Sequence, residues 1–376
     1  MDAENRAHLA ALAGFDHMTT SRLVALLSGR APIEAYAMAS GCAAPSAPVA
    51  GIFRRSKDLG ARWKASAAAI DPGAMEARCA DLGVRVLVPE DAEWPPQLMC
   101  DPRRPAVLFA QGDPDVLDGR RVGIVGTRNP TRRGAQSAAR FGSELATAGV
   151  RVVSGLALGV DGAAHRGALA ADGAPPIAVV ANGHDQPYPR QHRSLWMQVA
   201  EAGVVLSEWP PGTRPEPFRF PQRNRILAAL SELVVVVESR ERGGSLITAR
   251  EAAERGVDVF AVPGPIDQRS SVGTNRLLED GATPVASTDT LLVALGLDHR
   301  RAGRRRFDAR ALPRGDEAVV MDLCRSEPQS VESVAIALDW ELAHAAMALA
   351  RLERSGWLGE SGGWFEEVDE YAELAE

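Results

Sequence analysis

Four glycine-containing segments of the chain have features that suit a phosphate group. Each follows an apolar run and precedes a stretch of helical periodicity, so each is expected to be a turn between a strand and a helix. Glycine lets the backbone approach an anion closely, and a helix start attracts negative charge. Tight packing explains any single turn, but four turns with arginines among them predict an anion site: GTRNPT (126–131), SGLALGVDGAAH (154–165), NGHDQPYPRQH (182–192) and RGGSLITA (242–249).

The first of these turns departs from the pattern of a dinucleotide site. An apolar run leads into Gly126, but Thr127 follows and Arg128 stands where the fingerprint G-x-G-x-x-G requires its second glycine. An arginine at this place can grip a phosphate through two N–H groups at once. We therefore expect the Arg128 turn to bind phosphate, helped by the turn residues Ser154, Arg190 and Ser245.

A second pattern lies in the segment RPEPFRFPQRNRI (214–226). Arginines alternate there with two phenylalanines. Interleaved aromatic and guanidinium groups suit a single-stranded nucleic acid, because the bases stack while the phosphates pair with the cations. We expect at least one of the three arginines to have a structural role instead; the residues concerned are Phe218, Arg219, Phe220, Arg223 and Arg225.

The charge of the chain restricts how an anion can be bound. The net charge is −7, so an anionic partner must use a local basic patch. The only lysines are Lys57 and Lys64, and every later basic residue is an arginine. This excludes a Walker-A lysine or a lysine Schiff base beyond position 64, and it leaves arginine forks and backbone N–H groups as the phosphate ligands.

Catalysis and metal binding find little support in the sequence. Asp161 and His165 are four residues apart, but no third ligand stands at a suitable spacing, so we expect no metal site. We expect Asp161 to serve a helix N-terminus and His165 to line the anion cleft. The histidines have no serine or cysteine partner in the sequence, and the cysteines show no C-x-x-C spacing. The sequence therefore predicts a binding protein without a cofactor rather than an enzyme.

The elements that position these residues follow from hydrophobic patterning. Continuous Val, Ile and Leu runs alternate with helical stretches from about residue 84, which predicts an α/β fold with a mostly parallel sheet covered on both faces. The start MDAENRAHLA lacks signal-peptide features, and the apolar run near 233–237 is too short to span a bilayer, so we expect a cytoplasmic protein. Five segments are predicted: a helical domain (1–75), the α/β core (82–298), an arginine-rich linker (299–315), a winged helix (316–366) and an acidic tail (367–376).

Taken together, the motifs of the core resemble the DprA/Smf family of bacterial DNA-processing proteins. They occur in the family's order: GIVGTRNPT, VVSGLALGVDGAAHRGAL, YP before Arg190, FPQRNRILAALS, GGSLITAREAAERGVDVFAVPG and GTNRLLEDGA. The resemblance implies an extended Rossmann fold that binds single-stranded DNA, a SAM-like helical domain before it and a winged helix after it. It also implies a homodimer that loads the RecA recombinase onto incoming DNA in natural transformation.

By the same resemblance, Arg128, Ser154, Gly155, Arg190, Arg225 and Ser245 would lie in the DNA pocket. Position 182 departs from the family, with asparagine where glycine is usual, and the basic residue of the YP loop is arginine. With the residues selected above, the predicted DNA-binding set is Gly126, Thr127, Arg128, Ser154, Gly155, Arg190, Phe218, Arg219, Arg223, Asn224, Arg225, Gly243, Gly244 and Ser245.

An enzyme is the alternative interpretation of the core. The nucleoside monophosphate phosphoribohydrolases have a related domain with a Gly-Gly-x-Gly-Thr turn and a catalytic glutamate; the counterpart here is GGSLIT with Glu251, at a different spacing.

The third helix of the winged helix, at 341–354, is mostly apolar, and six acidic residues follow between Glu366 and Glu376. We therefore expect the C-terminal domain to bind protein or regulate, and to contribute little to DNA affinity.

Overall fold

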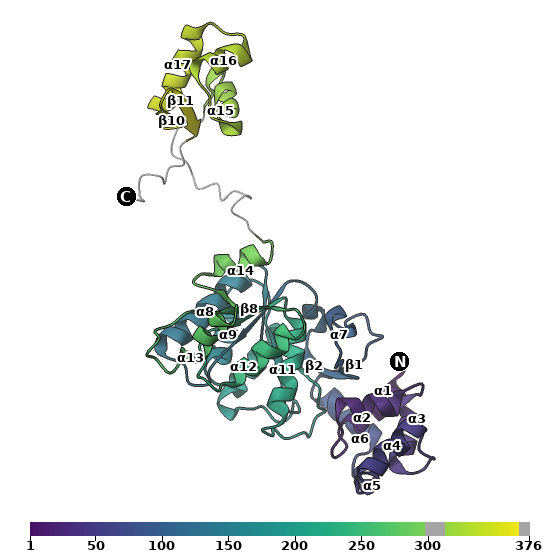
Figure 1. The fold of residues 1–376 in the computed structure, drawn as a ribbon. Coiled ribbons are helices and arrows are strands. Elements are labelled where there is room, and N and C mark those ends of the chain that lie inside the picture. Colours follow the sequence, from purple (N-terminus) through teal and green to yellow (C-terminus); the bar gives the residue numbers. More distant parts are fainter. Residues whose placement is uncertain (298–312, 368–376) are drawn as a thin grey trace. The chain divides into compact units, whose positions relative to one another are not determined.

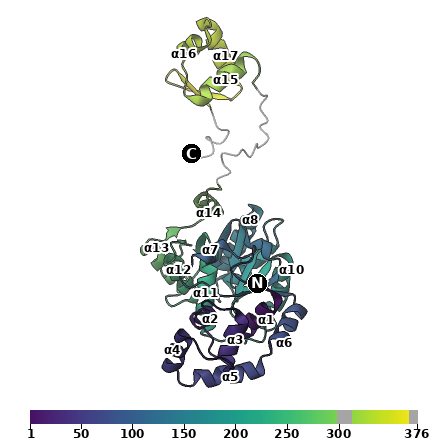
Figure 2. The ribbon, with the colours of Figure 1, turned by 90° about the vertical axis from the view of Figure 1, so that its right-hand side faces the viewer.

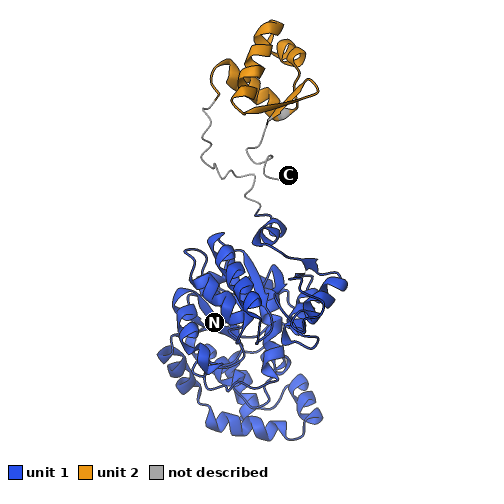
Figure 3. Cartoon of the chain, turned by 90° about the vertical axis from the view of Figure 1, so that its left-hand side faces the viewer, with its two compact units in different colours: residues 1–298 blue, residues 299–376 orange. Residues whose placement is uncertain are grey.

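The computed structural model describes residues 1–297 and 313–367. The chain divides into two compact units, residues 1–298 and residues 299–376 (Figure 3). The predicted linker at 299–315 lies outside the described residues except for its last three positions, and the predicted acidic tail lies outside them except for Glu367.

The first unit opens with helices that lie beside one edge of the sheet (Figures 1 and 2). Side chains of these helices, such as Leu12 and Trp63, belong to one buried cluster with Val84 and Phe109 of the first two strands. The helical region therefore packs directly on the α/β core. Its elements are α1 (Ala3–Ala13), α2 (Thr20–Leu27), α3 (Pro32–Ser40), α4 (Ala47–Arg55), α5 (Leu59–Ala69) and α6 (Pro72–Asp81).

A nine-stranded sheet forms the centre of this unit, in the order β1-β2-β6-β5-β4-β3-β7-β8-β9. Strands β1 and β2 are antiparallel additions at one edge, and the remaining pairs are parallel. The predicted α/β class with a mostly parallel sheet is thus confirmed. The strands are β1 (Val84–Leu87), β2 (Leu108–Gly112), β3 (Arg121–Val125), β4 (Arg151–Ser154), β5 (Ile177–Val180), β6 (Val204–Ser207), β7 (Leu233–Val236), β8 (Asp258–Ala261) and β9 (Thr283–Pro284).

Helices cover both faces of the sheet because the strand residues alternate between two buried clusters. In β7, Val234 and Val236 face one cluster, while Leu233 and Val235 face the other. Both faces are apolar, as a buried parallel sheet requires. The connecting helices are α7 (Pro96–Met99), α8 (Arg132–Thr147), α9 (Val160–Leu169), α10 (Arg193–Ala202), α11 (Arg219–Leu230), α12 (Gly244–Ala253), α13 (Val272–Glu279) and α14 (Thr288–Ala294), with 3-10 turns η1 (Pro114–Leu117) and η2 (Arg190–His192).

The strand order reverses between β3 and β7. From β3 the chain proceeds through β4, β5 and β6 on one side, and then returns to add β7, β8 and β9 on the other side. In open α/β sheets, ligands bind beyond the carboxyl ends of the strands at such a reversal. The turn after β3 is the Arg128 turn, and the turn after β7 leads into the predicted Gly243–Gly244 segment.

The second unit contains three helices followed by a hairpin. The elements are α15 (Asp316–Ser326), α16 (Val331–Leu338), α17 (Leu342–Arg354), β10 (Leu358–Ser361) and β11 (Trp364–Glu367). Across residues 1–297 and 313–367, no single helix is long and apolar enough to cross a membrane; the bent pair α16 and α17, at 117°, passes by length and composition alone.

Candidate nucleic-acid interface

A cavity of about 750 Å³ opens at the carboxyl ends of β3 and β7. Its walls come from the turn after β3, the segment that leads into α11, and the loop between β7 and α12. Eight residues of the predicted DNA-binding set line it: Gly126, Thr127, Arg128, Arg223, Asn224, Gly243, Gly244 and Ser245. The tertiary structure thus gathers three separate stretches of sequence around one space.

The turn after β3 is fixed by close packing of its backbone. A Cβ atom on Gly126 would lie 2.6 Å from Cγ2 of Val160 and 3.0 Å from the carbonyl oxygen of Glu238, so only glycine fits without a shift. The Thr127 N–H donates to the Glu238 carbonyl at 2.8 Å, and the Val160 N–H donates to the Thr127 carbonyl at 3.2 Å. These contacts hold the turn against α9 and β7 and leave the Arg128 side chain exposed.

Arg128 and two aromatic rings form one wall of the cavity. The Cζ atom of Arg128 lies 5.0 Å from the centroid of the Phe220 ring, and the Phe220 and Tyr188 rings lie 5.6 Å apart. In the described part of the chain, the Arg128 guanidinium makes no hydrogen bond or ion pair. A free cation on an aromatic face can pair with a phosphate while the neighbouring rings accept a base.

Two buried ionisable side chains, Arg223 and Asp161, line the cavity. Arg223 is 4% exposed and donates to the Val179 carbonyl at 2.7 Å. Burial lowers the pKa of Arg223 to about 10, so the guanidinium remains charged at neutral pH. Burial raises the pKa of Asp161, and the positive charges of Arg223 and Arg128 oppose this effect. Asp161 also accepts the Gly155 N–H at 3.1 Å, which ties the next strand-end turn to this pair.

The opposite wall comes from the start of α12. Ser245 donates to the Ser239 hydroxyl at 3.0 Å, and a Cβ atom on Gly244 would meet open space. Two exposed arginines missed in the predicted set, Arg240 and Arg242, also line the cavity. Their position directly before the Gly-Gly pair was a signal in the sequence that could have identified them. Two aromatic residues that line the cavity, Tyr188 and Phe220, are also absent from that set.

The remaining residues of the predicted set lie outside this cavity. Ser154 is buried and donates to the Ile124 carbonyl at 2.6 Å. Gly155 lies under Arg223, since a Cβ atom there would overlap the guanidinium. Arg190 lines a neighbouring groove with Arg193 and Arg214.

Phe218, Arg219 and Arg225 do not line this cavity. Phe218 and Arg219 line a different, larger cavity beside the helical region. Arg225 forms a buried ion pair with Glu208 at 2.5 Å and also donates to Thr20 of α2 at 3.1 Å. The expected structural arginine of this segment is therefore Arg225, which joins the core to the helical region.

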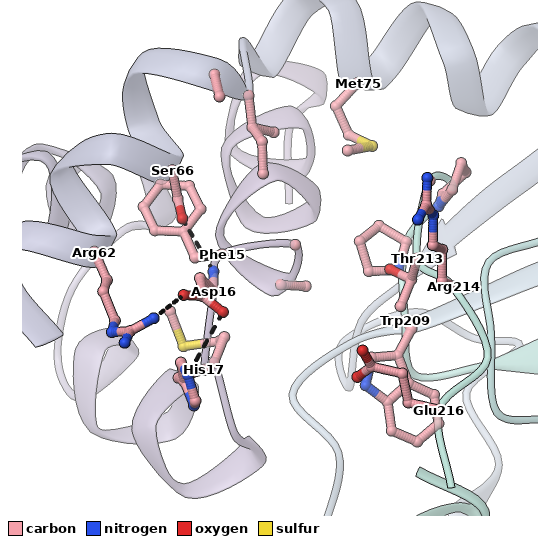
Figure 4. A pocket seen from close by; sticks show the side chains of 18 of the residues that line it. Phe15, Asp16, His17, Arg62, Ser66, Met75, Trp209, Thr213, Arg214 and Glu216 are labelled. Carbon is pink, nitrogen blue, oxygen red and sulfur yellow. Dashed lines mark hydrogen bonds and ion pairs between the residues drawn. The ribbon is translucent and has the colours of Figure 1, made fainter. Parts of the chain in front are cut away.

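The larger cavity, of about 1100 Å³, lies between the helical region and residues 209–222 (Figure 4). Three of its four arginines have acidic partners: Arg62 pairs with Asp16 at 2.9 Å, Arg78 pairs with Asp185 at 2.5 Å, and Arg219 lies 3.4 Å from Glu216. Paired charges reduce the attraction for a polyanion. The cavity at the ends of β3 and β7 is therefore the better candidate for a phosphate chain.

Two residues that the sequence suggested for other roles, His165 and Glu251, do not line the cavity. His165 is fully buried and does not line the cavity, so the expectation that it faces the anion cleft is wrong. Glu251 pairs with Arg103 and, at 2.6 Å, with Arg255, and it does not line the cavity either. Among the residues described, no cluster of three or more His, Cys, Asp or Glu side chains is suited to a metal ion.

The sheet order, with an arginine-lined cavity at its reversal point, defines a Rossmann-type α/β protein. Residues 85–296, more than half of the chain, match the model of the family described as DNA recombination-mediator protein A. The chain belongs to this family, as its motifs predicted.

Individual relatives agree with this assignment. The chain is 44% identical over 192 residues to DNA processing protein DprA of Bacillus subtilis (51% of this chain, 64% of the relative) and 41% identical over 208 residues to protein Smf of Escherichia coli (55% of each). The matches thus span less than two thirds of the length of these relatives. Among solved structures, DprA of Streptococcus pneumoniae has a TM-score of 0.63 at 30% identity, covering 78% of this chain and 98% of that one. DprA of Helicobacter pylori, described for its single-stranded DNA binding mode, has a TM-score of 0.51 at 30% identity, covering 57% and 96%.

Proposed function

We propose that this protein binds single-stranded DNA in the cavity at the carboxyl ends of β3 and β7. The observation that carries the proposal is the Arg128 guanidinium, which is exposed, makes no hydrogen bond or ion pair in residues 1–297 and 313–367, and lies over the Phe220 ring. A phosphate can pair with this guanidinium while a base stacks on the adjacent rings. Binding by a relative from H. pylori supports the same role here.

The shape of the cavity favours a single DNA strand over a duplex. The rings of Tyr188 and Phe220 can accept only unstacked bases, because bases in a duplex are already stacked on each other. Phosphate contacts and stacking carry little sequence information, so binding should tolerate sequence variation. The protein would act by binding, without a cofactor or a chemical step of its own.

The direct test measures the binding of labelled oligonucleotides of identical sequence in single- and double-stranded form. Single strands should bind more tightly, and affinity should fall with salt with a log–log slope of roughly −0.7 for each phosphate neutralised. Equal affinity for the duplex, or a flat response to salt, would contradict the proposal. Incubation with a nucleoside monophosphate should release no free base; release would support the phosphoribohydrolase alternative.

We further propose that the protein acts in the cytoplasm as a homodimer that protects incoming DNA and loads RecA onto it during natural transformation. Membership of the DNA recombination-mediator family supports this role. The test follows RecA filament formation on single strands coated with single-strand-binding protein. Addition of the protein should shorten the lag before RecA assembles, and its mass in solution should be that of two chains.

The flanking regions fit accessory roles. We propose that the helical region is SAM-like and that the order of three helices and a hairpin in the second unit is a winged helix. The exposed apolar side chains Ile336, Leu342 and Met347 favour contact with protein over contact with DNA phosphates. Removal of residues 316–376 should leave single-strand affinity within a few-fold of the full-length value, unless dimerisation requires this unit. Tight duplex binding by residues 316–376 would contradict this role.

A further inference from the structure

A carboxylate occupies the N-terminus of α8, which is the helix that follows β3. In Rossmann-type domains this terminus commonly holds a phosphate, because its N–H groups and dipole attract an anion. Here Oε2 of Glu238 accepts the Thr131 N–H at 2.9 Å, and Oε1 accepts the Thr131 hydroxyl at 2.5 Å. Thr131 is the N-cap of the helix, and its hydroxyl oxygen in turn accepts the Gly134 N–H at 3.0 Å.

The space that the carboxylate fills exists only because residue 134 is glycine. A Cβ atom on Gly134 would lie 2.4 Å from Cδ of Glu238 and 2.5 Å and 2.8 Å from its two oxygens. The carboxylate therefore lies directly on the first turn of α8. A phosphate could not reach this position without displacing it, and the negative charge of Glu238 would oppose its approach.

Glu238 also holds both ends of the turn that carries Arg128. Its backbone carbonyl accepts the Thr127 N–H at 2.8 Å, and its carboxylate accepts both donors of Thr131. The Arg128 side chain is thus directed outward from a turn that is fixed before and after it. Any anion held by Arg128 is bound on the open side of the turn, not at the helix terminus.

We infer that Glu238 is a selectivity residue that replaces the nucleotide phosphate at the N-terminus of α8. It closes the position that the terminal phosphate of a free nucleotide would use, and it leaves the exposed Arg128 for phosphates that continue along a chain. This inference deepens the proposed binding of single-stranded DNA by the same cavity and rests on that proposal for its biological meaning.

The test replaces the carboxylate and supplies phosphate in its place. Glu238→Ser opens the position, whereas Glu238→Gln keeps it filled. Glu232→Ser is the matched control, because Glu232 stands two residues before Val234 in the same strand region and accepts the Arg121 N–H at 2.9 Å, away from the cavity. The melting temperature is measured in potassium phosphate and in potassium chloride at equal ionic strength, since phosphate also stabilises proteins without specific binding.

Phosphate should raise the melting temperature of Glu238→Ser well beyond its effect on the parent, Glu238→Gln and Glu232→Ser. The affinity for phosphate derived from this dependence should be at least about tenfold higher than that of the parent. A Glu238→Ser protein that responds to phosphate like the other three would overturn the inference. If Glu238→Ser does not fold in chloride, its refolding yield in phosphate decides: selective recovery supports the inference, and equal failure in both salts overturns it.

The phosphate measurement uses no DNA, so its result is separate from that of the proposed function. A parent protein that fails to bind oligonucleotides would contradict single-strand binding while leaving the phosphate result intact. Conversely, a parent that binds single strands beside a Glu238→Ser protein without a phosphate response would overturn only the role of Glu238.

Discussion

The guanidinium of Arg128 lies over the ring of Phe220, with 5.0 Å between Cζ and the ring centroid. The two side chains come from the turn after β3 and from the first turn of α11, so the contact links two walls of the cavity. The face of the guanidinium is engaged by the ring, while its N–H groups stay available to a phosphate. The functional consequences of this arrangement can be measured one side chain at a time.

Replacement of Arg128 should weaken binding to single-stranded DNA without loss of stability. A hydrogen bond to a charged group contributes about 1.5–3 kcal/mol, so Arg128→Ala should lower affinity roughly 10- to 100-fold. Arg128→Lys should recover part of the loss, because lysine restores the charge but not the planar fork. Oligonucleotide titration and thermal unfolding together make the measurement.

The matched control is Arg166→Ala, which removes an exposed arginine of α9 outside the cavity. It should change the affinity for DNA by less than about twofold, since it alters only the long-range electrostatic field of the protein, which salt screens. A large fall in the melting temperature of Arg128→Ala, with affinity retained, would instead identify Arg128 as a structural residue.

Phe220 and Phe218 should differ in their effects on DNA binding although they are two positions apart. Stacking of a base on an aromatic ring contributes about 1–3 kcal/mol, so Phe220→Ala should weaken binding and Phe220→Trp should preserve it. Phe218→Ala, at a residue that is 55% exposed and lines the larger cavity, should have the smaller effect. The reverse order in an oligonucleotide titration would place the DNA strand in the larger cavity.

Arg225 should affect stability rather than DNA affinity. The side chains of Arg225 and Glu208 are 5% and 11% exposed, and loss of one partner leaves a buried charge unpaired. Arg225→Met should lower the free energy of unfolding by about 3–5 kcal/mol, and the double variant Arg225→Met with Glu208→Met should recover most of it. Urea denaturation gives these values. A loss of DNA affinity at unchanged stability would show that Arg225 contacts DNA directly, as the family resemblance implies.

Two buried histidines should make stability depend on pH. Burial lowers the pKa of His165 from 6.5 to about 3 and that of His184 from 6.5 to about 4. Between these folded values and 6.5 the unfolded chain binds more protons, so the free energy of unfolding should fall as the pH falls. The loss approaches about 1.4 kcal/mol per pH unit for each histidine well below 6.5.

Urea denaturation at pH 7, 6 and 5 measures this slope. His165→Leu should reduce it, because the substitution removes one of the two titrations. An identical slope in the parent and His165→Leu would rule out the buried imidazole as a source of the pH dependence.

The sequence by itself determined the sheet, the family and the Arg128 turn. Apolar strand runs separated by helical stretches specify a parallel sheet, since only a sheet buried on both faces tolerates continuous Val, Ile and Leu. The carboxyl ends of parallel strands meet at one edge, so the sequence alone predicts that the turns after these strands lie near each other. Gly126 and Arg128 could be selected for this reason alone.

Only the tertiary structure decided which side of the arginine-aromatic segment faces the cavity. The sequence suggested an alternation of Phe218, Arg219 and Phe220, but α11 begins at Arg219, so the helical period governs the side chains that follow. The α11 residues that line the cavity are Phe220, Pro221, Arg223, Asn224 and Leu227, and the last three lie three, four and seven residues after Phe220. Arg219 and Arg225 do not line the cavity, and Arg225 forms an ion pair with Glu208.

The contact between Glu238 and Thr131 also could not be predicted from the sequence, because the two residues are far apart along the chain. The Glu238 carboxylate reaches Thr131 because β7 lies beside β3, a pairing between strands far apart along the chain. Local composition specifies a strand followed by a glutamate, and it contains no information on which helix that glutamate will cap. The order of the strands is decided by packing of the whole sheet, and that order places the carboxylate at the start of α8.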